Sequence, residues 1–344
     1  MKLTFRKLSK LTLVLVYLVI VAGAVVRMTG SGMGCPDWPK CFGYYIPPTE
    51  DSELQWQPEH DYKKGQVIIV DETLQVAANN FTSDTEFNLE NWELYTKHDY
   101  AYFNAWHTWI EYINRLFGAL AGLATLILAF SSFKYWKKQK RVTILSWLVV
   151  FGMGFQAWLG ATVVYSVLEP VKITLHMLMA LLIVAMLLYL IYRVNEEDKR
   201  IRFDKTTLVF AIFALVLTVV QIILGTQVRQ FVDHQIEMLG ENAKNSWLDD
   251  PSLSFYIHRS FSLLVILING FLAFRIFKFD LGHIKIVWIL FLLLVEAFSG
   301  MAMYYLDFPF ASQPLHLVIA SILFGVQFYL VLDALKPKIS PKTL

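Results

Sequence analysis

Charge is scarce in this sequence. Only 17% of its 344 residues are Asp, Glu, Lys or Arg, and 56% are hydrophobic, whereas an ordinary soluble domain is about 25% charged. A chain this poor in charge cannot cover a soluble surface or remain disordered, which excludes a soluble enzyme and a disordered tail. Two cysteines are too few for a disulfide-stapled secreted module. No basic cluster is interleaved with aromatic residues, so nucleic acid is excluded as a partner.

Long apolar runs dominate what is present. A bilayer core about 30 Å thick requires about 20 apolar residues of helix, because a helix satisfies its own backbone polar groups. Period-2 alternation is absent, which argues against a β-barrel. The eight predicted spans are residues 11–27, 111–133, 143–165, 173–192, 207–228, 256–277, 286–305 and 314–333.

The charged residues indicate an orientation for these spans. With the N-terminus inside, most Lys and Arg residues fall in the inner connections, as the positive-inside rule requires, and most acidic residues fall outside. Both termini are therefore predicted to be cytoplasmic. The first span is predicted to be retained rather than cleaved as a signal peptide, because Gly23-Ala-Val-Val-Arg27 resembles Gly225-Thr-Gln-Val-Arg229 of the fifth span.

One large polar segment, residues 28–108, separates the first two spans and is predicted to form an outer loop or small cap. It contains the two cysteines of the chain, Cys35 and Cys41, with prolines between them. The outer side of such a membrane is oxidising, so a disulfide is predicted. Its spacing leaves open whether the disulfide is structural or relays electrons.

The two halves of the chain repeat each other. Glu111-Tyr-Ile-Asn-Arg115 aligns with Phe255-Tyr-Ile-His-Arg259, and Gln156 precedes His176 by the same 20 residues that separate Glu296 from His316. Four spans return the chain to its starting side, so both copies have the same orientation. We predict an all-α polytopic membrane protein of two pseudo-symmetric four-helix bundles, residues 1–192 and 206–344, joined by a cytoplasmic linker, 193–205.

Four of the eight histidines, His107, His176, His258 and His316, lie near the outer starts of even-numbered spans. An intramembrane imidazole requires a partner and is a functional hypothesis by default. In the second half, His258 and His316 can face each other across the bundle core and hold a haem iron as axial ligands, the alternative being a structural hydrogen-bonded pair. The remaining histidines, His60, His98, His234 and His283, are predicted to be solvated.

Arginines recur near the same outer face. They could bind haem propionates in bidentate fashion or anchor the helices at the membrane interface. They are Arg27, Arg115, Arg229 and Arg259.

The first half departs from the histidine pattern. Asn114 stands where the second half has His258, and His107 lies two helical turns earlier, about 10 Å along the axis. This predicts an open or weakly held iron face opposite His176. Glu111 lies on nearly the same face as Asn114; it could stabilise positive charge or move protons, or it could be a first-turn glutamate favoured by the helix dipole. Glu296 could be functional or an interhelical hydrogen-bonding group.

These residues resemble the haem A synthase family of respiratory membranes. The resemblance covers nearly all the chain except much of residues 45–105. It is carried by Gly30-Ser-Gly-Met-Gly-Cys-Pro-Asp-Trp-Pro39 with Cys41, Glu111, Arg115, His176, the His258-Arg259 pair and His316.

The resemblance implies oxidation of a methyl group of haem O to the formyl group of haem A by successive hydroxylations. It implies haem b held by His258 and His316 in the C-terminal bundle, the substrate haem held by His176 in the N-terminal bundle, an essential carboxylate at Glu111 and an outer-loop disulfide. Asn114 departs from the family's usual histidine, which leaves His107 as a replacement ligand.

The implied setting is the bacterial plasma membrane or the mitochondrial inner membrane. Expected partners are a haem O synthase, cytochrome oxidase assembly factors, a quinone-class electron acceptor and a second copy of the chain. The alternatives are a dihaem quinol-linked cytochrome and a haem transporter or chaperone for oxidase assembly.

Overall fold

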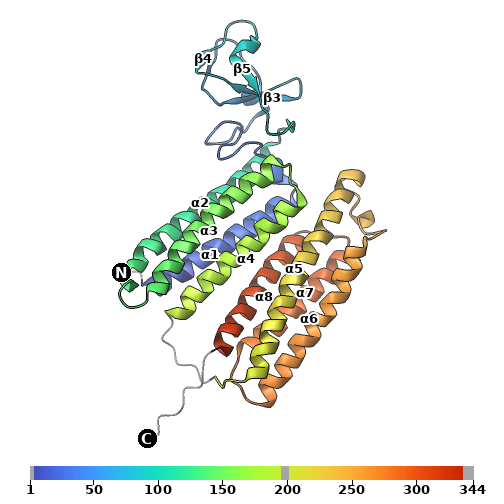
Figure 1. Ribbon diagram of the computed structural model, residues 1–344. Coiled ribbons are helices and arrows are strands. Elements are labelled where there is room, and N and C mark those ends of the chain that lie inside the picture. The colour runs from blue at the N-terminus through green and yellow to red at the C-terminus, as the bar shows by residue number, and fades with distance from the viewer. Residues whose placement is uncertain (1–3, 195–200, 336–344) are drawn as a thin grey trace. The chain divides into compact units, whose positions relative to one another are not determined.

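The computed structural model describes residues 4–194 and 201–335, and within them eight helices are long and apolar enough to cross a membrane (Figure 1). The prediction of an all-α polytopic chain is confirmed by these helices. Part of the predicted linker, residues 195–200, lies outside the described residues, as do the basic residues Lys2, Lys336, Lys338 and Lys342. The helices are α1 (Phe5–Met28), α2 (Ala105–Ser131), α3 (Lys140–Tyr165), α4 (Pro170–Arg193), α5 (Lys205–Leu239), α6 (Leu253–Lys278), α7 (Lys285–Tyr305) and α8 (Ser312–Ala334).

Helix α2 begins earlier than the apolar run that predicted it. The Asn104 side-chain oxygen accepts hydrogen bonds from the backbone N–H groups of Trp106 and His107, at 3.0 and 3.3 Å. Capping of this kind satisfies donors that the first turn would otherwise leave unpaired. His107 therefore lies within the helix, close to its start.

Helix α5 ends later than predicted, at Leu239 rather than near residue 228. Its added turns are stabilised by packing, because Val232 lies buried in a cluster with Trp247 and Phe308. The chain turns at Gly240, whose φ of 87° is readily adopted by glycine.

The chain divides into two compact units. One comprises residues 18–124 and 150–179, which are the polar segment and the adjoining parts of α1 to α4. The other comprises α5 to α8 and the remaining parts of α1 to α4, as far as they are described. The predicted bundle boundaries and the pseudo-symmetry stay predictions.

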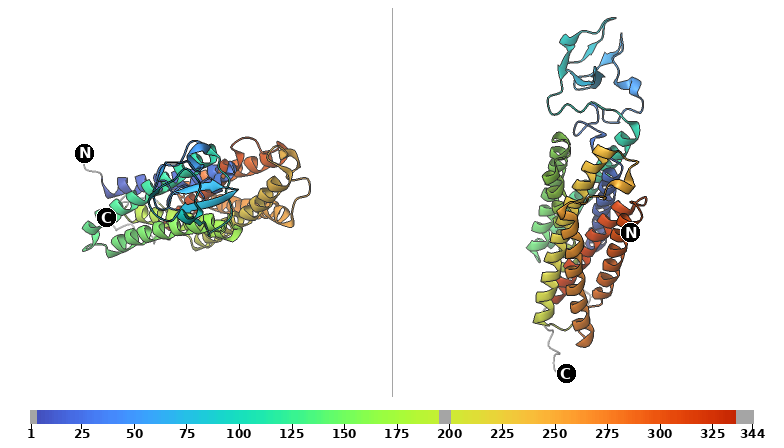
Figure 2. Two further views of the ribbon diagram at one scale, coloured as in Figure 1. Left: turned by 90° about the horizontal axis from the view of Figure 1, so that it is seen from above. Right: turned by 90° about the vertical axis from the view of Figure 1, so that its right-hand side faces the viewer.

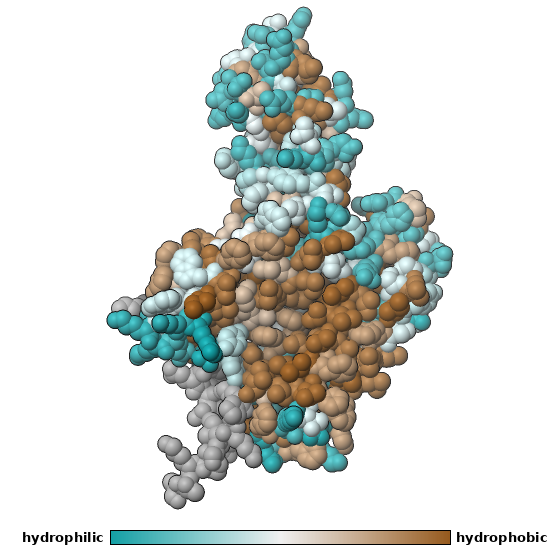
Figure 3. All heavy atoms as spheres, viewed as in Figure 1, coloured by the Kyte–Doolittle hydropathy of each residue, from teal (hydrophilic) through white to brown (hydrophobic). Residues whose placement is uncertain are grey.

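Helices α5 to α8 form a closed ring in which each contacts the next and α8 returns to α5 (Figures 1 and 2). Helices α6 and α8 are therefore diagonal to one another. The shared core includes Leu272, Ile286, Ile289 and Leu330. Large apolar side chains on these helices, Leu267 and Phe274 among them, are also exposed, and hydrophobic residues cover much of the visible helical surface (Figure 3). Such a surface suits lipid.

The polar segment, residues 29–104, contains short strands that the all-α prediction did not include. Strands β2 (Val67–Val70), β3 (Thr73–Ala77) and β5 (Trp92–Leu94) form an antiparallel sheet in the order β2-β3-β5, and β1 (Asp61–Tyr62) pairs with β4 (Phe81–Thr82). Consecutive residues of β2 belong to two different hydrophobic clusters: Val67 to the cluster of Cys35, and Ile68 to the cluster of Trp92. The sheet is thus buried on both faces, which gives this segment its own small core.

Candidate functional site

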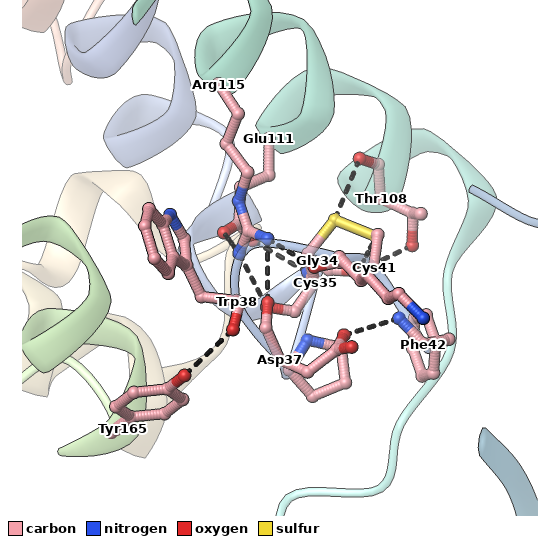
Figure 4. Close-up of polar contacts among 12 residues, drawn as sticks. Gly34, Cys35, Asp37, Trp38, Cys41, Phe42, Thr108, Glu111, Arg115 and Tyr165 are labelled. Carbon is pink, nitrogen blue, oxygen red and sulfur yellow. Dashed lines mark hydrogen bonds and ion pairs between the residues drawn. A yellow bond between two sulfur atoms is a disulfide. The ribbon is translucent and has the colours of Figure 1, made fainter. Parts of the chain in front are cut away.

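The predicted disulfide between Cys35 and Cys41 is confirmed, and it closes a loop that packs against the first turn of α2 (Figure 4). We call residues 34–43 the disulfide loop. A Cβ atom on Gly34 would lie 2.3 Å from the His107 carbonyl oxygen, so only glycine fits at this contact. The Thr108 hydroxyl donates to the Gly34 carbonyl at 2.7 Å. The loop and the helix are therefore in backbone contact.

Glu111 and Arg115 bind the disulfide loop through its backbone. The Cys35 N–H donates to the Glu111 carboxylate at 2.7 Å, and Arg115 pairs with the same carboxylate. The Arg115 guanidinium also donates to the carbonyls of Cys35, Asp37 and Lys40, at 2.9, 2.7 and 2.7 Å. Glu111 is only 4% exposed. The charge of Arg115 thus neutralises a buried carboxylate and holds the loop at the same time.

Further contacts fix the disulfide loop from other elements. The Asp37 carboxylate accepts from the N–H groups of Phe42 and Gly43 inside the loop. Burial raises the pKa of Asp37, and the Gly43 N–H and the charge of Arg115 oppose that rise. Tyr165 of α3 donates to the Trp38 carbonyl at 3.0 Å (Figure 4). The loop is therefore anchored to two helices.

His258 and His316 face each other across the α5–α8 ring. Their ring centroids are 6.4 Å apart, with planes at 72°. A metal bound at about 2 Å by one nitrogen of each imidazole would separate the ring centres by about 6 Å, so the spacing fits two axial ligands. In the described ranges no three His, Cys, Asp or Glu side chains gather as a metal site.

His176, His258 and His316 each lie against a glycine of a neighbouring helix, and so does Asn114. The glycine lies on the preceding odd-numbered helix, and the distances are measured from the Cβ atom that it lacks. An added Cβ would be crowded at Gly225, whereas at Gly23 and Gly300 it would only reach van der Waals contact. The pairs are Gly23 with Asn114 Oδ1 (3.8 Å), Gly160 with His176 Cε1 (3.4 Å), Gly225 with His258 Cε1 (3.1 Å) and Gly300 with His316 Cε1 (3.7 Å).

Asn114 therefore has the same kind of neighbour as the three histidines. Its Oδ1 atom and the Nδ1 atom of His176 are buried, and neither has a hydrogen-bond partner within the described part of the chain. Buried polar atoms of this kind call for a partner that the protein alone does not supply. His107, two turns away on a regular α2, lies about 10 Å along the axis from Asn114.

Polar side chains four residues before three of these glycines contact the histidines. The side-chain amide of Gln156 donates to the His176 carbonyl and that of Gln221 to the His258 carbonyl, both at 3.0 Å. Glu296 instead contacts the ring of His316. Sequence reasoning missed Gln221, although the Gln-x-x-x-Gly spacing shared with Gln156 could have found it.

The four arginines have different surroundings. Arg115 is engaged by the disulfide loop, Arg229 pairs with Asp233 at 2.8 Å, and Arg259 lies over the Tyr256 ring at 5.5 Å. Arg27 is half-buried in the last turn of α1. Their binding of propionates stays a prediction.

His283 was predicted to be solvated, and this is wrong. It is 2% exposed, although it lies in the turn between α6 and α7. The turn is bound to the segment that precedes α5, since the Arg202 N–H donates to the Leu281 carbonyl. Burial lowers the pKa of His283, which opposes a charged imidazole here.

Comparison with known proteins identifies the family. A family model described as "Cytochrome oxidase assembly protein" matches residues 6–328. The chain belongs to this family. Its relatives include proteins named "Heme A synthase" from Wolbachia sp. subsp. Brugia malayi, 26% identical over 91% of this chain and 91% of that protein, and from Wolbachia pipientis wMel, 25% identical over 95% and 92%. Another, from Shewanella oneidensis, is 28% identical over 65% of this chain and 56% of that protein.

These comparisons confirm the resemblance to haem A synthases drawn from the sequence. Together with the eight apolar helices they identify a multi-pass membrane protein.

Proposed function

We propose that this family member is a haem A synthase, an oxidoreductase that converts a methyl group of haem O to the formyl group of haem A by successive hydroxylations. The observation that carries the proposal is the family match over residues 6–328, with relatives named for this activity at similar length. The contact between Glu111 and the disulfide loop supports it, because it lies in the half where the substrate is expected.

In this proposal, His258 of α6 and His316 of α8 would hold the iron of haem b. Haem b, when bound, supplies one-electron transfer. The 6.4 Å spacing of the rings supports this assignment. Arg229 and Arg259 would hold the anionic propionates of haem b: Arg229 follows Gly225 by one helical turn, and Arg259 directly follows His258.

The substrate haem lies against His176, with Arg27 as its propionate partner. Asn114 offers a poor iron ligand, so the iron face opposite His176 stays open, and His107 is a replacement ligand only if the substrate lies nearer the start of α2. Glu111 stabilises positive charge that develops on the reacting carbon, or accepts its proton. Arg115 holds Glu111 and the disulfide loop, and it is a further candidate for a propionate of the substrate haem.

The proposed setting is the bacterial plasma membrane, or the mitochondrial inner membrane, with the termini inside and both haem sites near the outer face. Conversion of a methyl to a formyl group removes four electrons. Water supplies the oxygen, and the methyl group and water together give up four protons and four electrons. Two molecules of a quinone-class acceptor take up the four electrons and four protons as they become quinols. Haem O synthase, oxidase assembly factors and a second copy of the chain are the proposed protein partners.

Co-expression with a haem O supply, followed by analysis of extracted haems, tests the activity. Haem A should appear with the wild-type chain. Persistence of haem O with normally bound haem b would contradict the proposal.

Three variants test the residue roles, read by the extracted haems and by the spectrum of bound haem b. Glu111→Gln keeps an acceptor for the Cys35 N–H and should retain haem b, yet stop haem A formation. His258→Ala and His316→Ala should each abolish the low-spin haem b spectrum, and a retained spectrum would refute the ligand pair.

A further inference from the structure

Glu296 lies within α7 and contacts the ring of His316. Its side chain is 14% exposed, and its Oε2 atom lies 2.9 Å from His316 Nδ1. The Ser299 hydroxyl lies 2.8 Å from the same nitrogen. Both oxygens come from one turn of α7, so they meet the imidazole from the same side.

The partners define where the ring proton lies. A carboxylate only accepts hydrogen bonds. The Ser299 hydroxyl donates to the Glu296 carbonyl at 3.0 Å, which leaves its oxygen to accept from the ring. His316 Nδ1 therefore carries the proton that these oxygens share, and the lone pair of Nε2 is free for a metal.

His316 differs in this respect from the other two histidines of the proposed haem sites. The Nδ1 atoms of His258 and His176 have no hydrogen-bond partner in the described residues. The polar side chains facing them, Gln221 and Gln156, reach the backbone carbonyl instead of the ring. A carboxylate on the ring is thus specific to one of the three positions.

We propose that Glu296 is a positioning residue that lowers the reduction potential of the haem bound between His258 and His316. A carboxylate hydrogen-bonded to the far nitrogen of an imidazole orients the ring and makes it a stronger electron donor. A stronger donor favours ferric over ferrous iron. This inference rests on the proposed haem b site.

Glu296→Gln is the direct test, read by redox titration of bound haem b. The chain already has glutamine at this spacing before Gly160 and Gly225, so the substitution matches a pattern that the fold accommodates. The low-spin spectrum should persist. At a fixed potential the ferrous-to-ferric ratio should rise at least tenfold, which is about 59 mV for one electron.

Glu237→Gln is the matched control, because it removes the same charge from a side chain that is 80% exposed. It should leave the potential unchanged. An unchanged potential in Glu296→Gln, or an equal rise in Glu237→Gln, would overturn the proposal. A lower thermal stability of Glu296→Gln without a change of potential would show that Glu296 only stabilises the fold, and this too would overturn the proposal.

Ser299→Ala provides a second measurement that keeps the carboxylate. It removes one of the two acceptors and should raise the potential by less than Glu296→Gln. If Glu296→Gln loses haem b, the redox titration of Ser299→Ala tests the proposal instead. An unchanged potential in Ser299→Ala would then show that the hydrogen bonds to His316 Nδ1 do not set the potential. Absence of low-spin haem b from the wild-type chain would instead reject the proposed function.

Discussion

Replacing Arg115 with methionine should release the disulfide loop. Methionine keeps much of the side-chain volume but removes the ion pair with Glu111 and the hydrogen bonds to three loop carbonyls. Both side chains of the pair are largely buried, at 14% and 5% exposure. Breaking a buried pair by removing one partner costs about 3–5 kcal/mol, because the remaining charge has no compensation.

The disulfide itself reports this change. Cys35 and Cys41 are 0% and 1% exposed, so a water-soluble reductant reaches the sulfurs only when the loop opens. A loss of about 3 kcal/mol raises the population of the open loop by about 100-fold. The rate of disulfide reduction, followed by alkylation and mass spectrometry, should increase by a similar factor.

Arg141→Met serves as the control, since Arg141 is an exposed residue of α3. The rate of disulfide reduction in Arg141→Met should equal that of the wild type. A wild-type rate in Arg115→Met would refute the reasoning, because it would mean that Arg115 does not hold the loop closed.

Three further predictions concern the helices. Gly225→Ala places a Cβ 3.1 Å from His258, so it should weaken haem b binding and shift the haem b spectrum. Gly270→Ala, where nothing lies within 4 Å of the added Cβ, should do neither. Identical haem b spectra for Gly225→Ala and wild type would contradict this. Asp333→Ala leaves Lys285 without the carboxylate now 2.6 Å away and should cost about 3–5 kcal/mol in thermal unfolding, and a wild-type Tm would contradict it. Asp204→Ala should cost about 1–2 kcal/mol at pH 7, because it removes both the cap of α5 and the pair with Arg275. Hydrogen bonds from Arg275 lower the pKa of Asp204. The contribution of Asp204 to the free energy of unfolding is therefore complete above about pH 4 and is lost as the pH falls further. A stability difference between Asp204→Ala and wild type that persisted in strong acid would contradict this explanation.

The helical spans were predictable because a bilayer demands long apolar runs, but their ends depend on local contacts. Asn104 starts α2 through a cap that precedes the apolar run, and Val232 extends α5 through contacts with residues far along the chain. The strands were missed for a similar reason. The turn at Asp71 and Glu72, both with positive φ, lacks the glycine that usually marks a tight hairpin.

The candidate site could be predicted where the same residue type occupies matched positions in the two halves, but not where a side chain binds backbone groups. The facing of His258 and His316 follows from matched positions on helices that alternate around a ring. Three of the groups that accept hydrogen bonds from Arg115 are backbone carbonyls, which every residue has, so no pattern of side chains could indicate them. The burial of His283 likewise involves a contact between distant parts of the chain, because its turn is hydrogen-bonded to the segment that precedes α5.

The glycine facing Asn114 has a consequence for how such a chain can evolve. Gly23 lies beside Asn114 as Gly225 lies beside His258, so a histidine at residue 114 would also meet a glycine on the preceding helix. Asparagine and histidine codons differ by a single base. In the proposed function, one base change at residue 114 therefore separates a substrate site with a single facing histidine from one with two, and selection can move a lineage between the two by that change.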